Sequence, residues 1–203
     1  MNRSALSPRT IVGLLPLVRF PSRMALLPMV GLFMLSPVDL SAQVEGADFG
    51  PYIHSAGPVF EIPAPEFVAP ADMTYRVSFD LAVGSEGPED LNQGLNTVAR
   101  FLNMHGAAGI PRHRLQVAVV IHGTAAKDFL GAAAFREFAG YENPNLELME
   151  ELAAFGVRFV MCGQSLGARD IPRGELLAPV EVALSAITAH LVLQTEGYRV
   201  NPF

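Results

Sequence analysis

Residues 115–121 read LQVAVVI, a nearly unbroken apolar run in which three of the seven side chains are valine. A strand with one face in water alternates apolar and polar residues, whereas a run of this kind is typical of a strand covered on both faces. His122, Gly123 and Thr124 follow at once. We therefore expect a central, fully buried strand with polar groups just beyond its carboxyl end.

The segments before this run carry a strand pattern and then a helix pattern. Residues 75–83 alternate apolar and polar side chains of β-favouring types and then meet a loop containing glycine and proline, which predicts a strand. The next apolar side chains recur at spacings of four, three and four, as they do on one face of a helix. They are Leu91, Leu95, Val98 and Leu102. We expect Gly106 or Gly109 to end this helix.

The segments after the run continue the alternation. Asn143 and Pro144 have the residue types of an N-cap and a first helical position, and Gly156 is placed to close the helix that they open. Gly197 is placed to end the last helix in the same way. In order, the sequence predicts a helix over about 125–138, the helix that follows Asn143, a strand over 157–162, a strand over about 180–183, a helix over about 185–196 and a short strand over 198–200.

This order of elements predicts the fold class. Strands that alternate with helices form βαβ units, and their right-handed crossovers give a mostly parallel sheet. We expect a single α/β domain over residues 73–203, with helices on both faces of the sheet. The last helix has four apolar side chains that fall largely on one side, namely Leu184, Ile187, Leu191 and Leu193.

The first 42 residues have the pattern of a secretory signal peptide. Four arginines precede the apolar run 24–35, and Ser41 and Ala42 are small residues of the kind at which a signal peptidase cuts. A membrane anchor is the alternative, but it requires about twenty continuous apolar residues, and Arg19 and Arg23 separate the run 24–35 from the apolar residues before it. We expect residues 1–42 to be removed and the protein to be periplasmic or secreted, with no stable membrane anchor.

Residues 43–72 predict a proline-rich extension. Because proline fixes φ and lacks a backbone donor, regular structure is not expected there. The apolar side chains between the prolines disfavour a solvated tether, so we expect this extension to dock on the domain or on a neighbouring subunit. The prolines are Pro51, Pro58, Pro63, Pro65 and Pro70.

Composition excludes several classes of function. The chain has 203 residues with 14 basic and 20 acidic side chains, and its net charge is −6. Nucleic-acid partners are not expected, because their binding depends on neutralising phosphates with Lys and Arg. The single cysteine, Cys162, excludes an intramolecular disulfide and a cysteine-rich zinc site. No cofactor or metal site is predicted.

Two reactive side chains occupy the carboxyl ends of predicted strands. His122 follows the strand at 115–121, and Cys162 ends the strand at 157–162. Ligands bind at this edge of a parallel sheet, because its loops expose backbone amides. A turn with exposed amides after Cys162 would stabilise a thiolate. The loops therefore supply the candidate substrate-binding residues Gly123, Thr124, Gly163, Gln164 and Ser165.

Five short segments, taken in their order along the chain, match a known pattern. They are 75–80, 103–105, 119–123, 143–148 and 162–165. Together they resemble the DsrE/DsrF-like family, in particular its exported branch, over residues 57–203. The resemblance implies a compact α/β domain, assembly into trimers or hexamers, and sulfur relay through a cysteine persulfide. It also implies that Cys162 is the family's cysteine after the third main strand and that His122 belongs to the His-Gly after the second. The relay members act inside the cell, whereas this chain is expected to be exported.

The sequence leaves three hypotheses open. In the first, an exported sulfur-handling protein accepts sulfane sulfur on the Cys162 thiolate, with His122 favouring the thiolate or orienting the incoming group. In the second, a non-enzymatic small-molecule-binding or assembly domain keeps Cys162 as a small, buried and inert side chain. A peroxide-sensing thiol is a third reading, and it needs a resolving cysteine from a partner. The expected partners are further copies of the chain, as a homotrimer or hexamer, and a sulfur donor or acceptor protein.

Overall fold

The computed structural model describes residues 48–177 and 179–201. The segment predicted to be a signal peptide, and the first residues of the extension, lie outside these ranges. Within them no helix is both long enough and apolar enough to cross a membrane.

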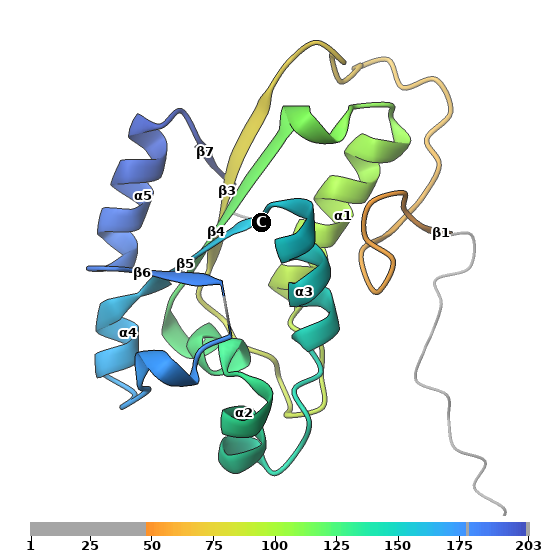
Figure 1. The fold of residues 1–203 in the computed structure, drawn as a ribbon. Helices are drawn as coiled ribbons and strands as arrows, with labels where there is room; N and C mark the ends of the chain where they lie inside the picture. The colour runs from red at the N-terminus through yellow and green to blue at the C-terminus, as the bar shows by residue number, and fades with distance from the viewer. Residues whose placement is uncertain (1–47, 178, 202–203) are drawn as a thin grey trace, which may run out of the picture. The chain divides into compact units, whose positions relative to one another are not determined.

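A five-stranded parallel sheet forms the centre of the domain (Figure 1). Its strands lie in the order β6-β5-β4-β3-β7, and each neighbouring pair is parallel. The predicted apolar run is the middle strand, with its last five residues fully buried or nearly so. The predicted parallel α/β class is therefore confirmed. The strands are β3 (Tyr75–Leu81), β4 (Leu115–Ile121), β5 (Arg158–Cys162), β6 (Val180–Ala183) and β7 (Arg199–Asn201).

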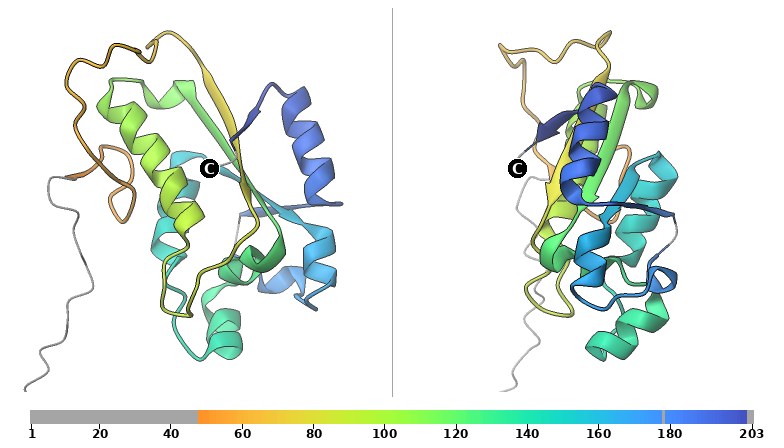
Figure 2. Two further views of the ribbon diagram at one scale, coloured as in Figure 1. Left: turned by 180° about the vertical axis from the view of Figure 1, so that it is seen from behind. Right: turned by 90° about the vertical axis from the view of Figure 1, so that its left-hand side faces the viewer.

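Helices cover both faces of the sheet, as predicted. From β3 to β6 the chain moves steadily across the sheet, and it then returns to β7 at the opposite edge. A right-handed crossover in the return direction places its helix on the opposite face. Figures 1 and 2 accordingly show α5 on one side and α1 and α3 on the other. The helices are α1 (Gln93–Ala107), α2 (Ala132–Ala139), α3 (Leu146–Phe155), α4 (Gly163–Gly167) and α5 (Ala186–Thr195), with short 3-10 helices η1 (Arg112–Arg114), η2 (Gly123–Phe129) and η3 (Arg173–Glu175).

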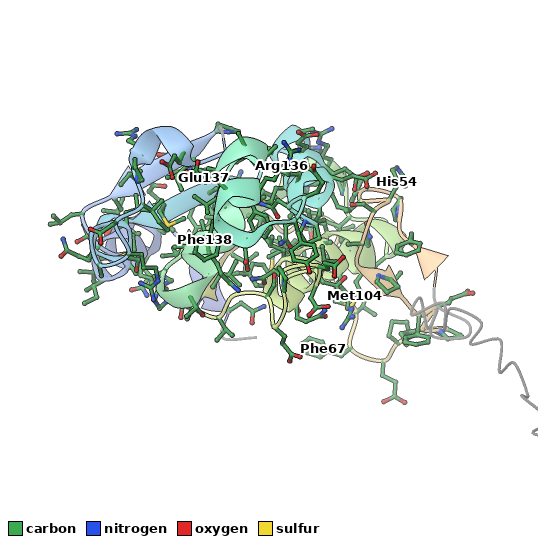
Figure 3. All side chains as sticks on the ribbon, turned by 90° about the horizontal axis from the view of Figure 1, so that it is seen from below. His54, Phe67, Met104, Arg136, Glu137 and Phe138 are labelled. Atoms are coloured by element: carbon green, nitrogen blue, oxygen red, sulfur yellow. The ribbon has the colours of Figure 1, made fainter. Side chains whose placement is uncertain are left out.

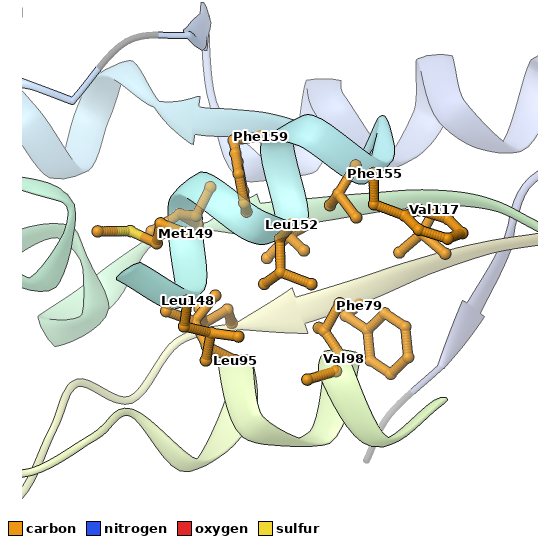
Figure 4. Close-up of a cluster of buried hydrophobic side chains, with 14 of the residues drawn as sticks. Phe79, Leu95, Val98, Val117, Leu148, Met149, Leu152, Phe155 and Phe159 are labelled. Atoms are coloured by element: carbon orange, nitrogen blue, oxygen red, sulfur yellow. The ribbon is translucent and has the colours of Figure 1, made fainter. Parts of the chain in front are cut away.

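The larger core lies between the sheet and the pair α1 and α3. Side chains of α3 project toward those of α1 and of the strands (Figure 4). Phe129 and Phe159 add an edge-to-face ring contact with centroids 5.4 Å apart. The labelled side chains of this core are Phe79, Leu95, Val98, Val117, Leu148, Met149, Leu152, Phe155 and Phe159.

The smaller core lies between the sheet and α5. It holds only Ala118, Val120, Val160, Ala189 and Leu193 as fully packed members. The single apolar side predicted for this last helix is wrong in one respect, because Leu193 faces the sheet whereas Leu184, Ile187 and Leu191 face solvent. α5 contains no Asp, Glu, Lys or Arg residue. The helix therefore has a large apolar surface in addition to the stripe that it buries.

The helix predicted over about 125–138 is instead two separate pieces, η2 and α2. Leu130 between them is extended and forms a bridge with Leu176, and the Gly131 amide donates to the Glu175 carbonyl at 2.8 Å. These contacts with a distant segment break the helix. Gly123 begins η2 with a φ of +56°, and a Cβ there would meet the Ala82 carbonyl oxygen at 2.4 Å.

The start of α3 also differs from the prediction. Asn145, not Asn143, is the residue that precedes the helix. The Asn143 side chain is buried and donates to the carbonyls of Asp128 and Leu130 at 2.8 and 2.9 Å. It therefore ties two loops together. The predicted end of the helix is confirmed, because Gly156 follows Phe155 with a φ of +107°.

The part of the extension up to Val59 is held against α1. Two-residue strands β1 (Asp48–Phe49) and β2 (Pro58–Val59) pair there, although no regular structure was predicted. The buried Asn103 accepts from the Ile53 amide at 2.9 Å and donates to the carbonyls of Ile53, Ala56 and Gly57. Each polar atom of the Asn103 amide is therefore paired with the backbone of the extension.

The part of the extension after Val59 is exposed. Phe67 is 97% exposed and points away from the domain, as Figure 3 shows. Met104 and Phe138, on α1 and α2, are further exposed apolar side chains labelled there. Only the last residues of this stretch contact the domain among the described residues, where the Tyr75 hydroxyl donates to the Pro70 carbonyl at 3.0 Å and Ala69 packs against the larger core.

Candidate functional site

Cys162 and His122 leave neighbouring strands side by side. Ile121 of β4 pairs with Met161 of β5, and His122 and Cys162 are the next residues along each strand. Since Ile121 and Met161 belong to the larger core, alternation along a strand directs the two residues that follow toward the α5 face. The structure thus brings imidazole and thiol to one edge and one face of the sheet.

The same alternation adds a residue that was not predicted. Phe79 and Leu81 of β3 point into the larger core, so Asp80 between them points to the α5 face. Asp80 pairs in register with Val120, which belongs to the smaller core. A carboxylate therefore lies on the face that carries His122 and Cys162.

Cys162 is a free cysteine with 5% of its surface exposed. Burial raises the pKa of this thiol, but hydrogen bonds from the side chain and backbone of Ser165 and from the amides of Ala186 and Gln164 outweigh burial. The pKa of Cys162 therefore lies below its ordinary value. Because the thiolate is the nucleophilic form of sulfur, these hydrogen bonds favour reactivity.

Ser165 links the two loops of the site. Its hydroxyl oxygen accepts the Gly123 amide proton at 3.1 Å. With its lone pair engaged by Gly123, the hydroxyl keeps its own proton to donate toward the sulfur of Cys162, in agreement with its effect on the thiol pKa. The loop after β4 therefore positions the donor that stabilises a thiolate at the end of β5.

Asp80 joins two histidines. His122 Nε2 and His190 Nε2 lie 2.9 and 2.8 Å from the same carboxylate oxygen, Oδ1. Partial burial works to raise the pKa of Asp80, but the hydrogen bond and charge of His190 and of His122 outweigh burial and bring that pKa below its ordinary value. The carboxylate is therefore ionised at neutral pH.

An open pocket lies beside this cluster. Ala186, whose amide lowers the pKa of Cys162, is one of its lining residues, so the pocket adjoins the surroundings of the sulfur. It is lined by Asp80, His122, Ala186, Ile187, His190, Gln194 and Val200, and we call it the α5 pocket.

The remaining predicted binding residues have different surroundings. Gln164 Nε2 donates to the Leu184 carbonyl at 3.2 Å, and a Cβ on Gly163 would meet the Ala183 carbonyl oxygen at 2.8 Å. Both therefore hold the loop after β5 against the end of β6. Thr124 faces the other way, because its hydroxyl accepts the Gly84 amide at 3.0 Å. Thr124 is thus not brought together with Cys162.

Asp80 and His190 are the site residues that sequence reasoning missed. Asp80 could have been predicted from the alternation of side chains along its strand, because that alternation places its carboxylate on the face to which residues 122 and 162 also point. His190 had little signal, because nothing local relates it to a side chain 110 residues away. Among the described residues, no group of three His, Cys, Asp or Glu side chains is arranged to hold a metal ion.

Sequence comparison identifies the family. The model of the DsrE/DsrF-like family matches residues 81–202, which is more than half of the chain. The chain belongs to the DsrE/DsrF-like family. Membership of the DsrE/DsrF-like family suggests a role related to sulfur relay. His122, Cys162 and His190 lie within the matched residues, and Asp80 immediately precedes them.

Solved structures give further similarities to this DsrE/DsrF-like domain. The protein of unknown function MTH1491 from Methanobacterium thermoautotrophicum is 20% identical, with a TM-score of 0.45, over 64% of this chain and 99% of that one. The ychN protein from E. coli is 16% identical, with a TM-score of 0.43, over the same shares. No curated protein matches the sequence.

Proposed function

We propose that this protein is an exported sulfur-handling protein in which Cys162 accepts sulfane sulfur, holds it as a persulfide and passes it to an acceptor thiol. One observation carries the proposal: the only cysteine of a DsrE/DsrF-like chain is surrounded by donors that bring its pKa below the ordinary value. A buried cysteine with a purely structural role has no need of such donors, because burial alone favours the neutral thiol.

The transfer needs no external oxidant. The Cys162 thiolate attacks the outer sulfur of the donor, a new S–S bond forms, and the S–S bond of the donor breaks with its electron pair on the leaving group. The outer sulfur then stays on Cys162 as a persulfide. When an acceptor thiolate attacks this outer sulfur, the Cys162 thiolate leaves and is regenerated.

The surrounding groups have separate roles in this proposal. The amides of Gln164 and Ser165, with the Ser165 hydroxyl, stabilise negative charge on the sulfur before attack and again as it leaves. Gly163 allows the close approach of the β6 end. Gly123 positions the Ser165 hydroxyl through its amide, and His122 precedes it at the end of the neighbouring strand β4.

The experiment is incubation of the purified protein with inorganic polysulfide or thiosulfate, followed by intact-mass analysis. We expect an increase by the mass of one sulfur atom, which a reducing thiol removes and which Cys162→Ser abolishes. Unmodified Cys162 with both donors between pH 6 and pH 9 would contradict the proposal.

The burial of Cys162 favours a second candidate, a small-molecule-binding or assembly domain with an inert thiol. Labelling of the thiol by a neutral alkylating reagent separates the two functions. If Cys162 reacts slowly in the native state and rapidly only after denaturation, the second candidate is correct. Rapid native labelling supports the persulfide carrier.

We further propose that the protein is periplasmic or secreted after removal of residues 1–42, and that it assembles as a homotrimer or a hexamer. Its composition supports export, because four arginines precede an apolar run that ends before small residues. The exposed apolar side chains Leu184 and Leu191, which do not line the α5 pocket beside Asp80, support assembly, since monomeric proteins rarely leave such a group uncovered.

A further inference from the structure

The cluster of Asp80, His122 and His190 is a set of titratable side chains that the persulfide chemistry above does not use. Two Nε2 atoms share one carboxylate oxygen, and all three side chains line the α5 pocket. These contacts settle the tautomers in part. Because each Nε2 donates its proton to Asp80, a neutral imidazole in this arrangement has its lone pair on Nδ1.

The two histidines differ in their ability to exchange a proton. His190 Nδ1 is buried and has no hydrogen-bond partner among the described residues. An N–H group at this atom would be buried without an acceptor, which is costly. His122 is the more exposed of the two side chains, at 29% against 19%. His122 is therefore the member of the pair that exchanges protons with the α5 pocket.

His122 is not needed to make the thiolate. The groups that lower the pKa of Cys162 are the side chain and amide of Ser165 and the amides of Ala186 and Gln164. The imidazole nevertheless leaves the strand next to the one that ends at Cys162, on the same face of the sheet. His122 also lines the α5 pocket together with Ala186, whose amide bonds the sulfur of Cys162.

We propose that the α5 pocket is the route by which a thiol-based sulfur donor reaches Cys162, and that His122, positioned by Asp80, donates a proton to the departing thiolate. Asp80 is the positioning residue, because it holds His122 through Nε2 and stabilises the imidazolium. His190 shares the carboxylate and fixes its orientation. This inference rests on the proposed function for its choice of donor.

The proposed transfer needs no external oxidant, and His122 recovers the proton that it gives up. The Cys162 thiolate attacks the outer sulfur of a donor R–S–SH, and the S–S bond breaks with its electrons on R–S⁻. The His122 imidazolium gives its proton to R–S⁻, which leaves as R–SH. The new Cys162–S–SH then loses its proton to neutral His122 and restores the imidazolium. The titratable groups around His122 are Asp80 of β3, which bonds it, His190 of α5, which lines the same pocket, and Cys162, which ends the neighbouring strand β5.

The test compares two small disulfides that differ in how much their leaving group needs a proton. Bis-hydroxyethyl disulfide releases a basic alkyl thiolate, whereas dithiodipyridine releases a weakly basic aromatic one. Both reagents react with any accessible thiolate, so this test does not require the protein to carry sulfur in the cell. The rate of mixed-disulfide formation at Cys162 is followed by intact mass in wild type, Asp80→Asn and His122→Gln. Asp90→Asn, a carboxylate outside the α5 pocket, is the matched control.

We expect Asp80→Asn and His122→Gln to slow the reaction of Cys162 with the alkyl disulfide by a factor of roughly ten to a hundred. The upper figure is the lower end of the range for general acid catalysis. The aromatic disulfide should change less than about twofold in both variants. Asp90→Asn should match wild type with both reagents.

Equal slowing of both reagents would show that Asp80 acts only on structure, and it would overturn the proposal. Unchanged rates in Asp80→Asn would overturn it as well, as would a native wild type that reacts with neither reagent. Failure of the proposed function looks different. In that case Cys162 reacts with both disulfides as expected but gains no sulfur from polysulfide or thiosulfate.

Discussion

At the scale of single residues, the Ser165 hydroxyl is the side chain that lowers the pKa of Cys162. Ser165 accepts from the Gly123 amide and keeps its proton for the sulfur of Cys162. Burial of the thiol acts in the opposite direction and favours its neutral form. The balance between these effects decides whether Cys162 is a nucleophile at neutral pH.

Ser165→Ala tests this balance. Removal of the hydroxyl leaves burial less opposed, so we expect the pKa of Cys162 to rise and its alkylation at pH 7 to slow by a factor of about three to ten, since each pKa unit is tenfold in the thiolate fraction. The measurement is the rate of iodoacetamide labelling between pH 6 and pH 10. Ser55→Ala, at a serine bonded to Glu151 on α3, is the control. A Ser165→Ala pH profile identical to that of wild type would show that the hydroxyl does not act on the sulfur.

At the scale of elements, the position of the extension depends on contacts with α1 and α3. The sequence of the extension does not predict these contacts. Besides Asn103 on α1, Glu151 on α3 accepts from the amides of His54 and Ser55 and from the Ser55 hydroxyl, all through Oε2 at 2.8 to 3.0 Å. Partial burial acts to raise the pKa of Glu151, but the hydrogen bonds from Ser55 and His54 outweigh it and lower that pKa. The folded state therefore prefers the ionised carboxylate.

This preference predicts a pH-dependent contribution to stability. A lowered folded-state pKa contributes stability above the ordinary glutamate value of about 4.3, and that contribution disappears as the pH falls through the lower folded-state value. We expect Glu151→Gln to lower the urea midpoint at pH 7 and to approach wild type below about pH 4. The adjacent, exposed Glu150→Gln should match wild type throughout. A midpoint difference for Glu151→Gln that persists unchanged at low pH would contradict the ionic origin of the contact.

At the scale of the whole molecule, α5 is the element with two roles. One side of the helix carries His190 to Asp80 and packs Ala189 and Leu193 on the sheet. The other side presents Ile187 and Leu191 to solvent, at 75% and 61% exposure. Ile187 also lines the α5 pocket, whereas Leu191 does not, so a contact centred on Leu191 can leave the pocket open.

Leu191→Asp tests whether α5 is an assembly surface. The side chain is exposed and does not line the pocket, so the change should leave the fold of the subunit intact. We expect it to shift the protein from a trimer or hexamer to smaller species in sedimentation velocity, because a charge would be buried at the interface. Phe138→Asp, at an exposed apolar residue of α2, should leave the assembly unchanged. The reverse pattern would place the interface on α2.

Local sequence patterns sufficed for much of this fold. The valine-rich run 115–121 predicted the central strand with its observed bounds, and the positions of Gly156 and Gly197 predicted where two helices end, because both facts depend on a residue and its near neighbours. The alternation of strand and helix patterns predicted the parallel sheet. It also placed His122 and Cys162 at the carboxyl ends of strands, since strand ends are read from the same local patterns.

Packing decided the rest. The helix predicted over 125–138 is broken because Leu130 and Gly131 bond to residues 175 and 176, and no local propensity contains that information. The same holds for the cluster around Asp80: His190 reaches it only because the right-handed return of the chain from β6 to β7 lays α5 across the face where residues 80, 122 and 162 point. Residue types and spacing encode which side chains face together along one element, whereas contacts between distant elements form only when burial of apolar surface assembles them.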